Sequence, residues 1–111
     1  MIPAGGWLVL GREGELLENG GVSLDHVYSG FTLGNTEDEV ILSDGGAVRA
    51  DTLVFSDAGG WPDTPGASMS LSGGVVDAVQ ADDVQLWCAS QMAWAPGSDL
   101  GTPGMANSTC P

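Results

Sequence analysis

The side chain of this chain that is best suited to acid–base catalysis is its only histidine, His26, which directly follows Asp25. A hydrolytic triad needs a histidine that is oriented by an acid and hydrogen-bonded to a nucleophile. Ser23 and Ser29 are near in sequence, but the chain has no Gly-x-Ser-x-Gly turn to expose a nucleophile. A lone histidine of this kind is typical of a structural or surface residue. We therefore expect no catalytic residue and no enzymatic activity.

Carboxylates are the other chemically capable groups, and they are densest at Glu37-Asp38-Glu39 and at Asp82-Asp83. Oxygen ligands suit Ca²⁺, which takes about 6–8 of them, but neither cluster has the alternating spacing of an EF-hand loop. We expect solvated charges at strand ends, with a weak calcium site as the alternative. The sequence therefore predicts no metal ligands, no cofactor-binding residues and no cofactor.

The charge balance narrows the choice of partners. The net charge is −13, because 15 acidic residues face only Arg12 and Arg49, and lysine is absent. Nucleic-acid binding requires clustered cations, so we expect no nucleic-acid partner. The longest apolar run, Trp7-Leu8-Val9-Leu10, is too short to cross a bilayer, and we expect no membrane insertion. Cations, basic proteins and neutral glycans are the favoured partners, while simple solubility is the alternative meaning of the charge.

The clearest local element is a β-hairpin. The segment 39–43 enters Asp44-Gly45-Gly46, and the segment 47–55 leaves it. Asp-Gly-Gly supplies the positive φ angles that a tight turn needs, and β-branched residues flank it. In the returning strand the two-residue period puts Asp51 beside Leu53 and Phe55 on one face, near the strand end, where Asp51 reaches solvent or caps a backbone group.

Other short segments complete the pattern of a single small domain. The run 7–10 has the length and composition of a strand buried on both faces, and the segments 22–28 and 67–71 alternate as short strands do. The segment 82–88 is either a short helical turn or an irregular arm that docks Trp87. The four tryptophans are expected to anchor the interior, and Trp94 is the one expected to be most exposed.

The end of the chain carries a family resemblance. The run Asp99-Leu100-Gly101-Thr102-Pro103-Gly104-Met105-Ala106-Asn107, with Trp87-Cys88 upstream, resembles the close of bacterial-type lamin-tail domains. Those domains end on Gly-Thr-Pro-Gly-Ala-Ala-Asn, and Met105 replaces one of the alanines. Further pieces follow in the family's order, and the resemblance runs from about Pro3 to Asn107; they are Gly6 to Arg12, Leu33 to Leu42, Asp51 to Phe55, Gly60-Trp61-Pro62 and Gly66 to Met69.

The resemblance implies an all-β fold, an immunoglobulin-like antiparallel β-sandwich over residues 1–107, followed by a tail or linker at 108–111. The family's first strands have no counterpart, so the sandwich is expected to be incomplete at its N-terminus. A gene fragment, a mis-assigned start and a half completed by another strand are the three explanations. An open sheet edge recruits strands, so we expect a second copy or a partner segment to pair with residues 7–10.

The resemblance also implies a role. We expect a non-catalytic interaction or anchoring module of an exported or cell-surface protein, although residues 1–6 show no signal peptide. The alternatives are an accessory domain of a secreted hydrolase or nuclease, and a glycan-binding module that depends on divalent cations. In an exported chain, the even count of two cysteines predicts a disulfide between Cys88 and Cys110. Free thiols in a reducing cytosol are the alternative.

Overall fold

The computed structural model describes residues 3–43, 45 and 49–111, and these form short strands and single 3₁₀ turns without an α-helix. The predicted all-β class is confirmed, because the regular elements of the described residues are strands and 3₁₀ turns. The elements in chain order are β1 (Leu10–Gly11), β2 (His26–Val27), β3 (Glu37–Ser43), β4 (Arg49–Ser56), η1 (Asp57–Gly59), β5 (Met69–Leu71), η2 (Gln80–Asp82), η3 (Val84–Leu86) and β6 (Trp87–Ala89).

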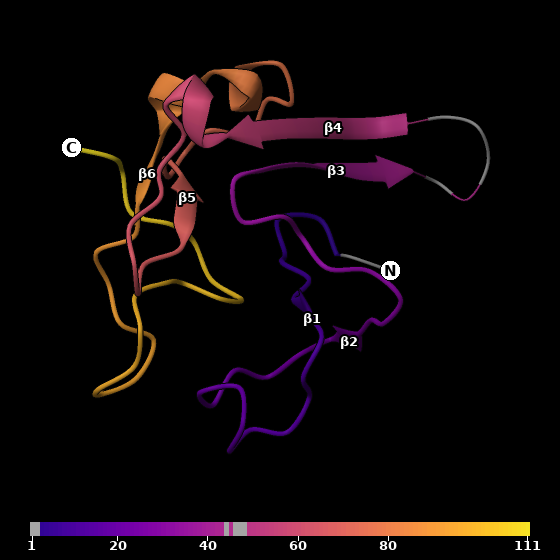
Figure 1. Cartoon of the computed structure of the whole chain (residues 1–111), viewed down its shortest axis with the longest axis vertical. Helices are drawn as coiled ribbons and strands as arrows, with labels where there is room; N and C mark the ends of the chain where they lie inside the picture. The colour runs from indigo at the N-terminus through magenta and orange to yellow at the C-terminus, as the bar shows by residue number, and fades with distance from the viewer. Residues whose placement is uncertain (1–2, 44, 46–48) are drawn as a thin grey trace.

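The strands of the described residues make three separate two-stranded sheets, β1–β2, β3–β4 and β5–β6. Figure 1 shows the long β3–β4 hairpin at one end of the molecule, β1–β2 toward the other, and β5–β6 to one side. The hairpin was predicted, and its antiparallel register pairs Val40 with Leu53 and Leu42 with Asp51. The predicted turn residues 44 and 46–48 lie outside the described residues.

The sheet β1–β2 corrects two predictions. Of the expected strands 7–10 and 22–28, only Leu10–Gly11 and His26–Val27 are strands, and they pair in parallel. The Val9 amide donates to an Asp25 carboxylate oxygen at 2.7 Å, and the Val9 carbonyl accepts from the Asp25 amide at 2.8 Å. Leu10 is 53% exposed. The prediction of a strand buried on both faces is wrong, because no second layer of the described chain covers this one.

The best-buried side chains of the described residues lie in β5 or directly after β5 and β6, and they are small and polar. Ser70, Ser72 and Ser90 are buried. The alternation predicted over 67–71 is confirmed as the strand β5. The helical-turn alternative for 82–88 is also confirmed, because η3 begins after Asp83, whose carboxylate accepts from the Gln85 amide at 3.0 Å.

The C-terminal residues bond to the segment that directly follows β5. The Gly73 amide donates to the Ser108 carbonyl at 2.9 Å, and the Cys110 amide donates to the Ser72 hydroxyl at 2.9 Å. Glycine is required at 73, because a Cβ there would collide with the carbonyl oxygen of Asn107. A disulfide joins Cys110 to Cys88 on β6. The end of the chain is thus held against β5 and β6.

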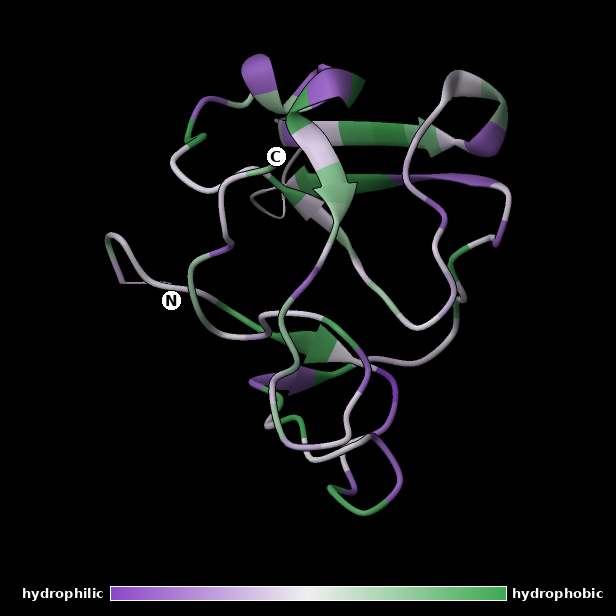
Figure 2. Ribbon diagram, turned by 90° about the vertical axis from the view of Figure 1, so that its left-hand side faces the viewer, coloured by the Kyte–Doolittle hydropathy of each residue, from purple (hydrophilic) through white to green (hydrophobic). Residues whose placement is uncertain are grey.

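The three sheets do not close over a common core. No apolar side chain of the described residues is fully buried. Figure 2 shows hydrophobic residues spread along the hairpin and the smaller sheets rather than gathered at one centre. The accessible surface is 7856 Å², whereas a folded monomer of 11.3 kDa exposes about 5,700 Å². The fold thus leaves about 2,000 Å² more surface in solvent than a closed domain of its size.

Candidate functional site

A cavity lies between β1–β2 and β5–β6, and we call it the apolar channel. Its volume is about 430 Å³, within the range of ligand-binding clefts. Apolar side chains from both sides form its walls: Val9, Leu10, Val22 and Leu24 from the β1–β2 side, and Met69, Leu71, Trp87 and Trp94 from the β5–β6 side and its following loop. No charged side chain lines it. The channel is therefore suited to an apolar ligand surface.

Local hydrogen bonds orient the two tryptophans of the channel. The indole N–H of Trp87 donates to the Ala81 carbonyl at 2.7 Å, and that of Trp94 donates to the Gly20 carbonyl at 2.8 Å. With both N–H groups satisfied, the rings offer only hydrocarbon to the channel. Trp94 is half-buried, whereas Trp7 is 54% exposed. The prediction that Trp94 is the most exposed tryptophan is wrong, because its bond to Gly20 bridges two distant parts of the chain.

A second cavity of about 280 Å³ extends the apolar surface beneath the hairpin. Val40 and Leu53, which are paired across β3 and β4, contribute to it, and Leu71 and Trp87 are shared with the apolar channel. Asp51 lies at its margin, and its carboxylate accepts from the Thr52 amide at 2.8 Å. That bond confirms the expectation that Asp51 caps a backbone group. Leu71 and Trp87 thus form the partition between two open apolar spaces.

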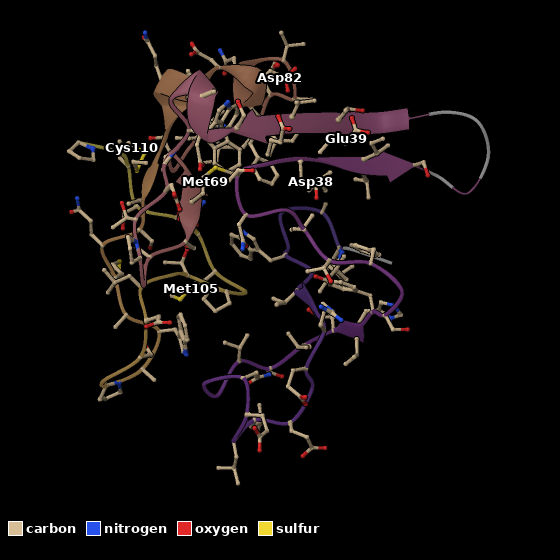
Figure 3. All side chains as sticks on the ribbon, in the orientation of Figure 1. Asp38, Glu39, Met69, Asp82, Met105 and Cys110 are labelled. Atoms are coloured by element: carbon tan, nitrogen blue, oxygen red, sulfur yellow. A yellow bond between two sulfur atoms is a disulfide. The ribbon has the colours of Figure 1, made fainter. Side chains whose placement is uncertain are left out.

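The histidine and the acidic residues that the sequence analysis considered for catalysis or metal binding lie apart from one another. His26 is exposed on β2, away from any metal-binding group in the described residues. Figure 3 shows Asp38 and Glu39 on the hairpin strand β3 and Asp82 on η2. Within residues 3–43, 45 and 49–111, no three side chains of the histidine, cysteine, aspartate or glutamate types gather to hold a metal ion. We therefore take the apolar channel as the candidate functional site.

Sequence reasoning predicted one binding segment that reaches the channel, the expected strand acceptor at residues 7–10, of which Val9 and Leu10 line it. The alternation over 67–71 located Met69 and Leu71 on a strand, but nothing local indicates that Leu24, Met69 and Trp94 approach one another. A β-strand pattern reports which side chains share a face, and it does not report whether another layer covers that face. The channel is a product of tertiary arrangement.

Hydrogen bonds to the backbone shift the pKa of the carboxyl group of Asp38. Its carboxylate accepts from the Gly34 amide at 2.6 Å and from the Glu39 amide at 2.7 Å. The bond from Gly34, followed by the one from Glu39, holds the pKa of Asp38 below its ordinary value of 3.8. These bonds fix the entry of the chain into β3, so Asp38 is a structural cap.

We expect the Gly34 loop to loosen only in strong acid. A lowered carboxyl pKa contributes stability that is present above the unfolded value near 3.8 and is lost as the pH falls through the lower folded value. NMR titration of the Asp38 carboxyl carbon and the Gly34 amide should give one shared midpoint below 3.8. Asp38→Asn should remove that titration step from the Gly34 amide. A midpoint at or above 3.8 would contradict this account.

Comparison of the chain with protein-family models, with curated proteins and with solved structures finds no match. No helix in the described part of the chain has the length and apolar character needed to cross a membrane.

Proposed function

We propose that this chain is a non-catalytic interaction module of an exported or cell-surface protein, and that the apolar channel is its binding surface. The observation that carries the proposal is an open, uncharged cavity of about 430 Å³ in a fold whose apolar side chains are not fully buried within the described residues. Exposed apolar surface of this extent marks interaction sites in soluble proteins. We propose further that the sheets belong to an incomplete immunoglobulin-like sandwich of the lamin-tail type.

The disulfide supports the exported setting. Structural disulfides persist in oxidising compartments and are rare in the cytosol, and small exported domains with weak cores rely on them. The Cys88–Cys110 bond ties the last residues to β6, next to the channel. This is the support that the structure offers for an extracellular or cell-surface location.

The chemistry of the channel favours a polypeptide partner over a glycan. Sugars need several convergent polar groups, whereas Ser68, Thr102 and Asn107 are among the few polar residues at the channel. Asn107 and Thr102 already bond to each other, and the Asn107 amide also donates to the Leu71 carbonyl. The remaining surface is hydrocarbon. A protein segment with apolar side chains is the better chemical match.

Photo-cross-linking at Met69 tests the proposal. A photoreactive methionine analogue at Met69, inside the channel, should cross-link to a polypeptide segment outside residues 1–111 in cells that make the protein. The same analogue at Met105, which is 51% exposed and does not line the channel, is the matched control. Figure 3 shows the two methionines on separate segments. Cross-links from Met69 that stay within the chain, or that equal those from Met105, would overturn the proposal.

A further inference from the structure

Building on the proposed function, we infer that the occupant of the apolar channel is an extended β-strand with apolar side chains at alternate positions and lysine or arginine at its ends. Its central residues pair with the outer edge of β5 at Met69 and Leu71. The inference depends on three features of the described residues: a gap in the edge of β5, the amount of uncovered surface, and the charge of the chain.

The hydrogen-bond pattern of β5 identifies the gap. The Ser90 amide donates to the Ser68 carbonyl at 2.8 Å, and the Ser72 amide donates to the Leu86 carbonyl at 2.7 Å. Bonding residues alternate along an antiparallel pair, so the backbone groups of Met69 and Leu71 point away from β6, toward the outer edge. That edge adjoins the apolar channel, which Met69 and Leu71 line.

The rest of the chain covers this edge at one end of the gap, where the Asn107 side chain donates to the Leu71 carbonyl at 2.8 Å. The Ser68 amide faces the β6 side of the strand, where it donates to the Leu100 carbonyl at 2.9 Å, and that bond leaves the outer edge open. The Met69 amide and carbonyl and the Leu71 amide have no bonding partner among the described residues. Unpaired backbone groups on a strand edge are a template for strand addition.

The uncovered surface is large enough for a polypeptide. The chain exposes about 2,000 Å² beyond the expectation for a closed domain, whereas a standard protein interface takes about 800 Å² from each partner. A metal ion or a short glycan would leave most of that surface in water. An extended strand on the edge of β5 would instead present alternate side chains to the channel that Leu24 and Trp87 line.

The charge decides between a second copy and a different partner. Two copies would bring two net charges of −13 together, and like charges oppose association. A segment with cationic ends is instead attracted to the acidic surface while its uncharged middle enters the uncharged channel. The partner is therefore a basic-ended strand rather than another copy of this chain.

The test uses the disulfide-intact chain and the synthetic peptide Lys-Val-Thr-Val-Thr-Val-Lys. The peptide should slow hydrogen exchange of the Met69 and Leu71 amides by about tenfold or more. Replacing its central valine with proline, which cannot donate the pairing bond, should abolish that protection. Replacing its lysines with glutamates should weaken binding by about tenfold at low salt. Unchanged Met69 and Leu71 exchange at a saturating concentration of the lysine peptide would overturn the inference.

Two variants of the chain separate channel binding from surface attraction. Leu24→Asp places a charge in the channel and should abolish protection, while Leu17→Asp, at a fully exposed leucine outside the channel, should leave it unchanged. Equal loss in both variants would also overturn the inference. If Met69 cross-links to another polypeptide but the peptide gives no protection, the β-strand inference fails and the interaction module stands. If both results are negative, both fail.

Discussion

Replacement of both cysteines by serine is expected to lower the free energy of unfolding by about 3 kcal/mol. The Cys88–Cys110 bond closes a loop with a sequence separation of 22, and in the chain-entropy model a loop of this size restricts the unfolded chain by that amount. A small domain with no fully buried apolar side chain in its described part has little stability in reserve. We therefore expect the doubly substituted chain to be largely unfolded at 37 °C.

Two measurements check this prediction. Denaturant unfolding of the native and Cys88→Ser/Cys110→Ser chains gives the difference in the free energy of unfolding. Serine is nearly isosteric with cysteine, so the difference reports the loss of the disulfide. Intact mass after alkylation under denaturing, non-reducing conditions shows whether the thiols are bonded. Uptake of two alkyl groups by the native chain would contradict the disulfide, and equal stability of the two chains would contradict its contribution.

Trp87→Ala is expected to lower the free energy of unfolding by about 3 kcal/mol, the low end for tryptophan truncation because the side chain is only half-buried. Its ring packs against Trp61 with centroids 5.5 Å apart, and its indole N–H donates to the Ala81 carbonyl. It also forms part of the wall of both apolar cavities. Removing it merges the two spaces and leaves the Ala81 carbonyl without its donor.

Two further substitutions separate the contribution of the Trp87 hydrogen bond from that of its packing and provide an exposed tryptophan as a control. Trp87→Phe keeps most of the packing and loses the hydrogen bond, so it should cost about 1 kcal/mol. Trp7→Ala removes a tryptophan that is 54% exposed, and it should change stability by less than about 0.5 kcal/mol. Urea unfolding followed by circular dichroism measures all three. If Trp87→Ala proves no more destabilising than Trp7→Ala, Trp87 is not an anchor of the fold.

The local elements were predictable where neighbours in sequence supply the forces. The hairpin of β3 and β4 follows from β-branched residues on both sides of an Asp-Gly-Gly turn signal, and its observed register pairs Leu42 with Asp51. The 3₁₀ turn after Asp83 follows from a short-range cap. Alternating serines and apolar residues likewise gave β5. Each of these needs only contacts within a few residues or across one turn.

The segment 7–10 shows where local reasoning failed. Four consecutive apolar residues predict a strand covered on both faces, but only Leu10 enters a strand, and Trp7 and Leu10 are more than half exposed. A side-chain carboxylate of Asp25, rather than a backbone carbonyl, accepts from the Val9 amide. The apolar side chains of a segment indicate that its burial would be favourable in free energy. Whether it is buried depends on a second layer, which the sequence of the segment does not specify. We therefore place the proposed strand acceptor at the edge of β5 rather than at residues 7–10.

The sequence by itself determined the all-β class, the hairpin, the acidic charge of −13 and the even pair of cysteines. The hairpin, the charge and the cysteine count depend on local propensity or on composition, which need no knowledge of the rest of the fold, whereas the all-β class was expected from the family resemblance. Only the tertiary structure decided that Leu24, Met69, Trp87 and Trp94 line one channel, and that the outer edge of β5 is open at Met69, next to the bond from Asn107 to Leu71. Such features arise from packing between segments far apart in sequence, because side-chain periodicity fixes the face that a residue occupies and not the neighbour that it meets.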